Sequence, residues 1–393
     1  MSPTQPGVTL GGPVSRAERA IAPDLARGLM LLLIALAYAP TYLTNVDDGF
    51  WLRPGGGSTV DNAVNFASLL LLDNRAYPLF AALFGYGMAV LVSRQLAAGT
   101  AESEVRMRLR RRSLALLLFG FVHGALIYPG EILGPYAVAG LLIGWLLFRD
   151  NRTLVKAVAA IAPIYLVTIP VIGVMMRSGG EFGENSLGTY PETVLMQAAA
   201  YPFALVFNVV FFPIVLAILL GAWAGKRALL HRPAEHSRSL GRIATVGIGV
   251  SLAGALPAAL IGAELWHPGA TAGTVLLSLH IATGVFGGFG YAALFGLLGA
   301  RLQHSSGVLV RSLTATGQRS LTCYLLQSAL IFVVMSPVAL DVGGPVHATG
   351  AALVAVAAWL AGVALSVLLE RAQRRGPADA LLRHLIYRDR AST

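Results

Sequence analysis

Apolar runs of roughly 20 residues recur along the whole chain, each followed by a short polar or charged stretch. A run of this length crosses the hydrocarbon layer of a bilayer as a helix, so the pattern predicts transmembrane helices. The polar stretches leave no room for a soluble domain. We therefore predict an all-α, polytopic integral membrane protein with one domain of about ten transmembrane helices. The expected spans are residues 22–44, 76–98, 113–129, 131–148, 153–176, 200–224, 242–263, 271–298, 317–338 and 348–370.

Basic residues concentrate in every second connection between these spans. Lys and Arg accumulate on the cytoplasmic side of membrane proteins, so the alternation predicts that both termini are cytoplasmic. The chain then divides into a cytoplasmic N-terminal tail (1–21), a transmembrane domain (22–370) and a basic cytoplasmic tail (371–393). The bases of the two internal loops that decide this orientation are Arg106, Arg108, Arg110, Arg111, Arg112, Lys226, Arg227, Arg232 and Arg238.

Two segments do not fit this simple pattern. Residues 59–72 are too short to cross a bilayer alone, so they lie in the outer interface or re-enter the membrane, and the sequence leaves this question open. Residues 193–201 raise the same question before the sixth span. The residues Ala35-Leu36-Ala37 also resemble a signal-peptide cleavage site, but removal of the first span would have to preserve the alternation of loop charge.

The composition supports a membrane location and excludes other classes of protein. Charged residues make up 12% of the chain, about half the share in a soluble domain, and the mean hydropathy is +0.69. The net charge of +10 would suit a nucleic-acid partner, but the bases follow the loop alternation instead. We therefore expect the lipid bilayer as a partner and no nucleic acid. Cys323 is the only cysteine, and no cluster of ligating residues predicts a metal site.

The first span begins with an acid and a base, in the segment PDLARG at residues 23–28. Asp24 and Arg27 are three residues apart, so they share one face of a helix. The apolar run that follows is long enough to reach the outer face by itself, which places both residues at the inner boundary of the membrane. They either anchor the helix end, with Arg27 extending to water, or orient a bound anionic ligand.

His123 lies about 15 Å into the third span, near the middle of the membrane. An ionisable residue at this depth is a functional candidate, because its charged form is costly there. Glu131 follows at the outer end of the same helical hairpin, and Tyr136 begins the fourth span. A histidine beside a carboxylate suits general-base catalysis. The alternative is a neutral histidine that bonds a neighbouring helix.

Three further polar residues are candidates for lining a substrate site. His280 lies at a similar depth in the eighth span, before glycines spaced for close helix packing, and it either bonds within the core or lines a site. Arg75 opens the second span from the outer side, where it can meet an anionic group. Gln327 is an uncharged polar residue within the ninth span, where hydrogen bonding between helices is the default role.

Four segments of the chain stand out as motifs: PDLARG (23–28), YPLFAALFGYGMAV (77–90), RRRSLALLLFGFVHGALIYPGEILGPYAVAGLL (110–142) and TGQRSLTCYLLQSALI (316–331). Together they resemble successive motifs of the YeiB-like bacterial inner-membrane proteins. That family is distantly similar to the membrane acyltransferase superfamily, which includes cell-surface glycan O-acyltransferases and heparan-alpha-glucosaminide N-acetyltransferase. The resemblance implies a multi-pass protein of the inner (plasma) membrane. It also implies transfer of an acyl group from cytosolic acyl-CoA, with no bound cofactor, to an acceptor across the membrane.

The chain departs from the resembled families at individual positions. Many of the acyltransferases place a catalytic histidine eleven residues after the first-span arginine, where this chain has Tyr38. The usual hairpin aspartate of the YeiB-like proteins is Glu131 here, and a usual asparagine of the ninth span is Cys323. The resemblance therefore leaves His123 as the best remaining base.

These observations lead to an expected polar pocket, open to the outer side, in which an acyl group passes to an envelope glycan, a lipid or an exported metabolite. The competing hypothesis is a transporter or exporter of a small metabolite without covalent chemistry, in which His123 and Arg75 bind substrate or relay protons. The third hypothesis is a purely structural membrane protein. The sequence leaves the oligomeric state open. The candidates are His123 and Glu131 for catalysis, and Asp24, Arg27, Tyr38, Arg75, Tyr136, His280 and Gln327 for substrate binding.

Overall fold

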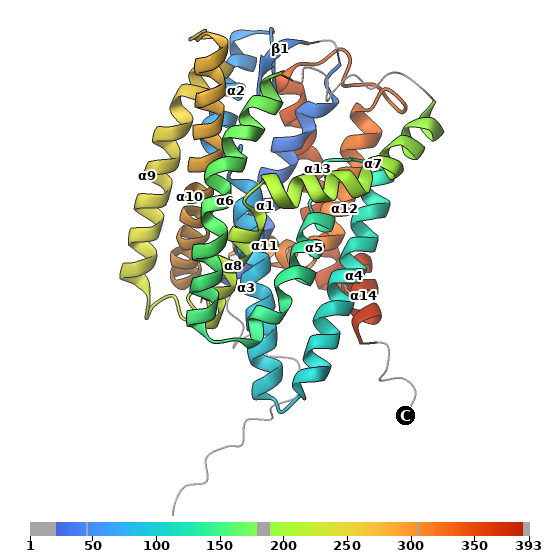
Figure 1. Ribbon diagram of the computed structural model, residues 1–393. Coiled ribbons are helices and arrows are strands. Elements are labelled where there is room, and N and C mark those ends of the chain that lie inside the picture. Colours follow the sequence, from blue (N-terminus) through green and yellow to red (C-terminus); the bar gives the residue numbers. More distant parts are fainter. Residues whose placement is uncertain (1–20, 45, 179–188, 304, 306, 388–393) are drawn as a thin grey trace, which may run out of the picture.

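The protein is a bundle of helices with a small β-hairpin at one end (Figure 1). The computed structural model describes residues 21–44, 46–178, 189–303, 305 and 307–387. Within them, strands β1 (Asp47–Phe50) and β2 (Arg53–Gly55) pair antiparallel. The helices are α1 (Ala22–Tyr38), η2 (Ala39–Tyr42), α2 (Thr59–Leu71), α3 (Ala76–Ala97), α4 (Glu102–Leu126), α5 (Leu133–Ile143), η3 (Gly144–Phe148), α6 (Asn151–Ser178), α7 (Tyr190–Phe211), α8 (Ile214–Lys226), α9 (Ser237–Gly262), α10 (Ala270–Leu302), α11 (Val308–Gln318), α12 (Ser320–Met335), α13 (Ala348–Arg371) and α14 (Pro377–Ile386).

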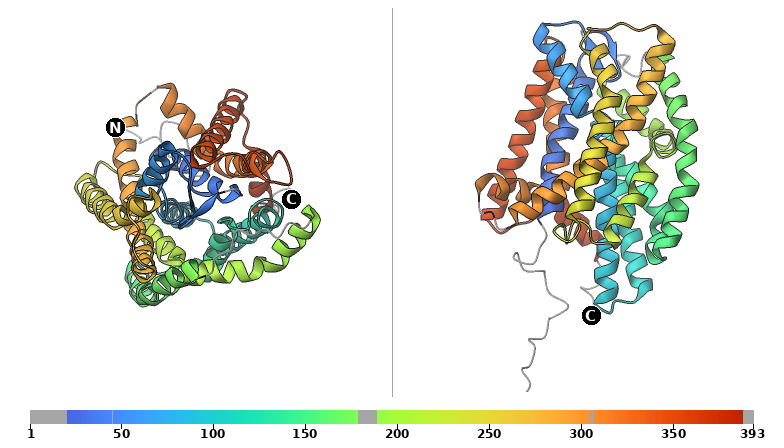
Figure 2. Two further views of the ribbon diagram at one scale, coloured as in Figure 1. Left: turned by 90° about the horizontal axis from the view of Figure 1, so that it is seen from above. Right: turned by 90° about the vertical axis from the view of Figure 1, so that its left-hand side faces the viewer.

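Helix α1 lies inside the bundle rather than at its surface. It packs against α3, α10, α11, α12 and α13, and Figure 2 shows α6, α9 and α13 further out. Its first turn contains Pro23, whose missing amide hydrogen is not needed there, and Asp24, whose carboxylate suits the positive end of the helix. Because most of its apolar side chains are buried, the first expected span belongs to the protein core.

The two ends of the bundle differ in charge. At the lower end in Figure 1 lie the α3–α4 turn, the α8–α9 connection and α14; we call this the basic end. The arginines expected in a loop between the second and third spans lie instead in the first half of helix α4, directly after this turn. The β1–β2 hairpin and the α9–α10 connection lie at the opposite end, the hairpin end. The described chain both begins, at α1, and finishes, after α14, at the basic end, while residues 1–20 and 388–393 lie outside the described residues. The location of the basic end on the cytoplasmic side of the membrane stays a prediction.

Seven helical segments of the described chain are long and apolar enough to cross a membrane, and an eighth results if α11 and α12 count as one broken span. The prediction of an all-α membrane protein is thus confirmed, whereas the count of ten spans is not. The seven segments are Ala22–Tyr42, Thr59–Ala97, Asn151–Met176, Tyr190–Phe211, Ser237–Gly262, Ala270–Leu302 and Ala348–Arg371.

The count differs because several apolar runs are divided differently from the expectation. Helix α2 begins with a capping box, in which the side chains of Ser58 and Asp61 bond each other's backbone amides, and after a short turn it is followed by α3. Residues 59–72 therefore join the second span in one long apolar segment. The expected span 200–224 is two helices: α7 runs across the other helices in Figure 1, whereas α8 packs along α3.

The expected ninth span is broken where α11 meets α12, and the two helices are bent by 90°. Gly317 lies next to the break and against α1, where a side chain would collide with the backbone of Asp24. The guanidinium of Arg319 holds the bend by donating to the backbone oxygens of Ala315 and Arg374. The break therefore places the first turn of α12 beside α1, inside the basic end.

Candidate binding site at the basic end

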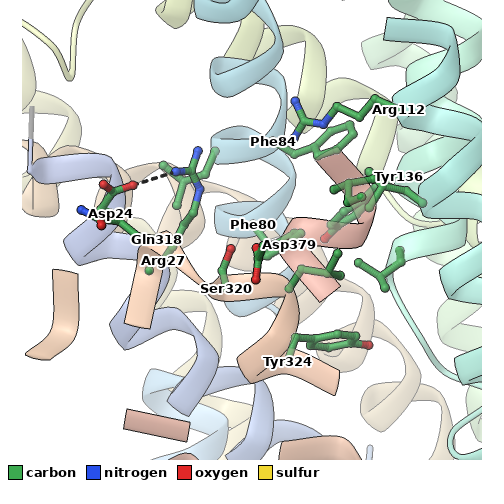
Figure 3. Close-up of a pocket in the computed structure, with 16 residues that line it drawn as sticks. Asp24, Arg27, Phe80, Phe84, Arg112, Tyr136, Gln318, Ser320, Tyr324 and Asp379 are labelled. Carbon is green, nitrogen blue, oxygen red and sulfur yellow. Dashed lines mark hydrogen bonds and ion pairs between the residues drawn. The ribbon is translucent and has the colours of Figure 1, made fainter. Parts of the chain in front are cut away.

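A cavity of about 230 Å³ lies at the basic end, between α1, α3, α4, α5, the α11–α12 break and α14 (Figure 3). Apolar side chains of α3 form one wall, and polar side chains come from helices far apart in the sequence. Contrary to the expectation of a pocket on the outer side, this cavity lies at the end predicted to be cytoplasmic. Its polar lining residues are Asp24, Arg27, Arg112, Tyr136, Gln318, Ser320, Tyr324 and Asp379.

Asp24 and Arg27 form an ion pair in the wall of the cavity, with 3.2 Å between Asp24 Oδ1 and Arg27 Nη1. The Asp24 side chain is almost completely buried, whereas 26% of the Arg27 side chain is exposed. Gly87 on α3 leaves room for the guanidinium, since a Cβ there would lie 3.2 Å from Arg27 Nη2. The pair therefore lies where a ligand in the cavity can reach Arg27, as the ligand-orienting hypothesis requires.

Arg112 enters the same cavity from α4, on the side away from α1 (Figure 3). Its guanidinium carbon lies 5.2 Å from the ring centre of Phe84, so the charge is held over an aromatic face. No acidic residue in the described part of the chain forms an ion pair with it. The sequence predicts Arg112 only as a loop base, because the local pattern does not distinguish it from Arg110 and Arg111.

Asp379 reaches the cavity from α14, a helix within the segment expected to be a basic tail. Its Oδ2 accepts hydrogen bonds from Thr322 Oγ1 at 2.7 Å and from the Thr322 amide at 3.1 Å. Burial raises the pKa of the Asp379 carboxyl, and the bonds from Thr322 oppose this shift. Asp379 is a cavity residue that was not predicted from the sequence. The signal was the pattern of a short helix after Gly376, with Pro377 at its start and an acid in its first turn.

His123 lies behind Tyr324 and does not line the cavity. The two ring centres are 5.1 Å apart, and Tyr324 is itself part of the cavity wall. Only 2% of His123 is exposed, and neither ring nitrogen has a hydrogen-bond partner among the described residues. Because a buried polar group without a partner costs free energy, His123 is a candidate for a functional role.

Glu131 has partners other than His123. Its carboxylate accepts hydrogen bonds from the amides of Leu133 and Gly134 and from Tyr201 Oη, the last at 2.7 Å. These bonds satisfy the amides at the start of α5 and join α5 to α7. The structure therefore does not bring the expected histidine–carboxylate pair together, because the nearby backbone amides occupy the carboxylate.

Tyr136 is another expected candidate that lines the cavity, and its hydroxyl donates to the backbone oxygen of Tyr77 at 2.7 Å. Tyr38 and Gln327 lie outside the cavity. The Tyr38 hydroxyl donates to a serine of α12 at 3.0 Å, and the Gln327 amide donates to a backbone oxygen of α1 at 3.1 Å. Both bonds join α1 to α12, and any contact of these residues with substrate stays a prediction.

Arg75 and His280 are buried outside the cavity. The Arg75 guanidinium donates to three backbone oxygens, from the α2–α3 turn region and from α9. His280 is fully buried on α10, and its ring nitrogens find no partner within the described residues. The structure thus gives Arg75 a clear packing role and leaves its binding role as a prediction.

Comparison with known proteins places the chain among bacterial relatives. Residues 224–389 match the family described as "Protein of unknown function (DUF418)". The chain is 26% identical over 398 residues to "Uncharacterized protein YxaH" of Bacillus subtilis (strain 168), which covers 93% of each chain. It is 26% identical over 402 residues to "Uncharacterized protein YeiB" of Escherichia coli (strain K12), covering 94% of this chain and 97% of the relative. The chain is similar to these YeiB-like proteins over nearly its whole length.

The YeiB-like resemblance predicted from the motifs is thereby confirmed, while kinship to the acyltransferases stays a prediction. The DUF418 region contains α9 to α14, and so contributes Ser320, Tyr324 and Asp379 to the cavity. Arg27 and Arg112 come from the part of the chain before that region. The cavity therefore forms only where the DUF418 region packs against the helices that precede it in the chain.

Proposed function

We propose that this YeiB-like protein is a membrane acyltransferase whose cavity at the basic end receives an acyl-CoA donor. The observation that supports this most is the presence of two guanidinium groups, Arg27 and Arg112, on different walls of one cavity. Arg27 forms an ion pair with Asp24, whereas Arg112 has no ion-pair partner in the described chain. Guanidinium groups bind phosphate oxygens two at a time, and CoA carries phosphates at the end remote from its thioester.

The first turn of α12 adds to the anion-binding character of the cavity. The break after α11 brings Ser320 and the amide end of α12 to the cavity wall. The amide end of a helix carries a partial positive charge that favours anions. The Asp379 carboxyl already accepts a hydrogen bond from one of these amides, that of Thr322. Burial raises the pKa of this carboxyl. A bound anion therefore competes with Asp379, and binding is coupled to the position of α14.

The size of the cavity limits how much of the donor it encloses. Sites that enclose a drug-sized ligand span roughly 300–1,000 Å³, whereas this cavity has about 230 Å³. It therefore suits one part of acyl-CoA, with the remainder outside the basic end. Apolar side chains such as Phe80 and Leu116 line the same space and suit an uncharged part of the donor.

In the proposed reaction, the hydroxyl oxygen of the acceptor bonds to the acyl carbon and the thioester C–S bond breaks. His123 takes the hydroxyl proton and returns it to the departing thiolate. Two observations support this role: the ring nitrogens of His123 have no partner among the described residues, and its ring contacts Tyr324 of the cavity wall. The step requires Tyr324 to turn aside. The acceptor is an envelope glycan, a lipid or an exported metabolite.

A second function, transport of a small anionic metabolite without covalent chemistry, is favoured by a different observation. Helices α11 and α12 form a broken span, and the break lines the cavity. Discontinuous helices with exposed ends form the substrate sites of many secondary transporters. Under this alternative Arg27 and Arg112 bind the transported metabolite, and no acyl group is transferred.

Purified protein distinguishes the two functions. For an acyltransferase, acetyl-CoA should raise the unfolding temperature in detergent, and slow transfer to water should release free thiol. Arg27→Lys should fold normally but lose this stabilisation, because lysine keeps the charge without the planar fork. Arg112→Gln should lose it as well. The matched control is Arg242→Gln, which removes an exposed arginine of α9.

Three results would contradict the acyltransferase proposal. One is wild-type protein that neither gains stability from acetyl-CoA nor releases thiol. Another is an equal loss of stabilisation in Arg242→Gln, which would indicate a general effect of charge. The third is uptake of a small anion by protein-containing vesicles together with no thiol release, which would favour the transporter.

A further inference from the structure

A second hollow, which we call the α4–α5 groove, lies on the outside of the bundle at the basic end. It has a volume of about 500 Å³, and its walls are α4 on one side and α5 with η3 on the other. On α4, Arg106, Arg110 and Leu114 line the groove. These residues are four apart, so they form a row along one helix face, with steps of about 6 Å.

The α4 row changes from charged to apolar along the helix. Beyond Leu114 the same face continues with Leu118, of which 57% is exposed. Exposed leucines in a membrane protein face lipid tails, and arginines next to them lie at the level of the lipid phosphates. The α4–α5 groove therefore extends across the boundary between the headgroups and the hydrocarbon layer.

The other wall of the α4–α5 groove is open and partly aromatic. Helix α5 ends at Ile143, and at the next residue, Gly144, an added Cβ would meet no atom within 4 Å. Trp145 follows and is 50% exposed, and Leu141 lies one turn earlier on the same wall. Tryptophan is enriched at the membrane interface, where its ring contacts both headgroups and chains. This wall thus offers an apolar channel with an interfacial aromatic side chain.

The two arginines of the groove differ in their partners. Arg106 Nε donates to Glu102 at 2.8 Å, and its guanidinium carbon lies 4.2 Å from the ring centre of Phe148. Arg110 is exposed, and within the described residues no acid or other hydrogen-bond partner engages it. Arg106 is therefore held in place across the groove, and Arg110 keeps its donors for a ligand.

We propose that the α4–α5 groove is a binding site for an anionic phospholipid. The lipid phosphate lies against Arg110 and Arg106, and one acyl chain follows Leu114 and Trp145. The charge of the arginines selects an anionic headgroup, because basic pockets between helices on the cytoplasmic side bind such headgroups. This site is separate from the cavity around Arg27 and does not depend on its function.

Native mass spectrometry of the full-length protein tests the proposal, with phosphatidylglycerol or phosphatidylcholine added to the detergent. We expect the wild type to retain phosphatidylglycerol in preference to phosphatidylcholine. Arg110→Gln should weaken phosphatidylglycerol binding about five-fold, the effect of one arginine near an anionic surface. Arg242→Gln removes an exposed arginine of α9, outside the groove, and should leave binding unchanged.

A second variant tests the path of the acyl chain. Gly144→Leu fills the groove, and it should fold, because the backbone at Gly144 (φ −55°) suits leucine and the space around it is open. Binding of phosphatidylglycerol should be lost in this variant while the unfolding temperature without lipid stays that of the wild type. Equal retention of the two lipids, or wild-type binding by either Arg110→Gln or Gly144→Leu, would overturn the proposal.

Discussion

Replacing Gly317 by alanine should destabilise the protein and displace one wall of the cavity. Gly317 packs against α1, and a Cβ at this position would lie 2.6 Å from the carbonyl carbon of Asp24 and 3.0 Å from its Cα. Ordinary contacts between carbon atoms are about 3.5–4.0 Å, so α1 and α11 would have to separate by about 1 Å. Overpacking of this kind costs about 1–3 kcal/mol of unfolding free energy.

The same displacement should weaken ligand binding, because the contact lies one turn before Arg27 on α1. Gly249 of α9 provides the matched control, since no atom lies within 4 Å of a Cβ added there. Alanine at this exposed helical position should be neutral or stabilise by up to about 1 kcal/mol. The measurement is the unfolding temperature of both variants in one detergent, with and without acetyl-CoA. A Gly317→Ala protein as stable as Gly249→Ala would refute the close contact between α1 and α11.

Three further predictions concern orientation, the buried histidine and α14. Reporter fusions after residues 105, 230 and 385 should be cytoplasmic and those near 55, 185 and 343 external, and two or more reversed positions would refute the orientation. His123→Gln should insert normally but release no thiol from acetyl-CoA, because glutamine cannot carry the proton. His280→Gln should reduce thiol release less. An active His123→Gln variant would show that His123 has a structural role. The pKa of Asp379 is raised in the folded state, so protonated Asp379 stabilises the fold. This stabilisation is complete below the unfolded-state pKa of about 3.9 and is lost as the pH rises through the folded-state pKa. Unfolding temperatures measured from about pH 4 to pH 7 should therefore fall relative to those of Asp379→Asn, and a constant difference would contradict the shift.

The helical membrane character of the protein could be predicted from the sequence, and so could the gathering of its bases at one end of the bundle. In a bilayer each backbone polar group must be satisfied within its own segment, so an apolar run of sufficient length is a helix whatever its neighbours are. The same local rule does not place turns inside an apolar run. For that reason it did not predict that residues 200–224 would form α7 and α8, or that the span beginning at residue 317 would be broken.

The composition of the cavity was decided only by the tertiary structure. Arg27, Arg112 and Asp379 lie far apart in the chain and meet because α1, α4 and α14 pack around the α11–α12 break. His123 and Glu131 are close in the chain, yet the start of α5 occupies the carboxylate. Hydropathy depends on the transfer free energy of each residue, so the sequence by itself determined the apolar helices and the side that carries the bases. A binding site depends on which faces of distant helices meet, and that is a property of packing which no local pattern contains.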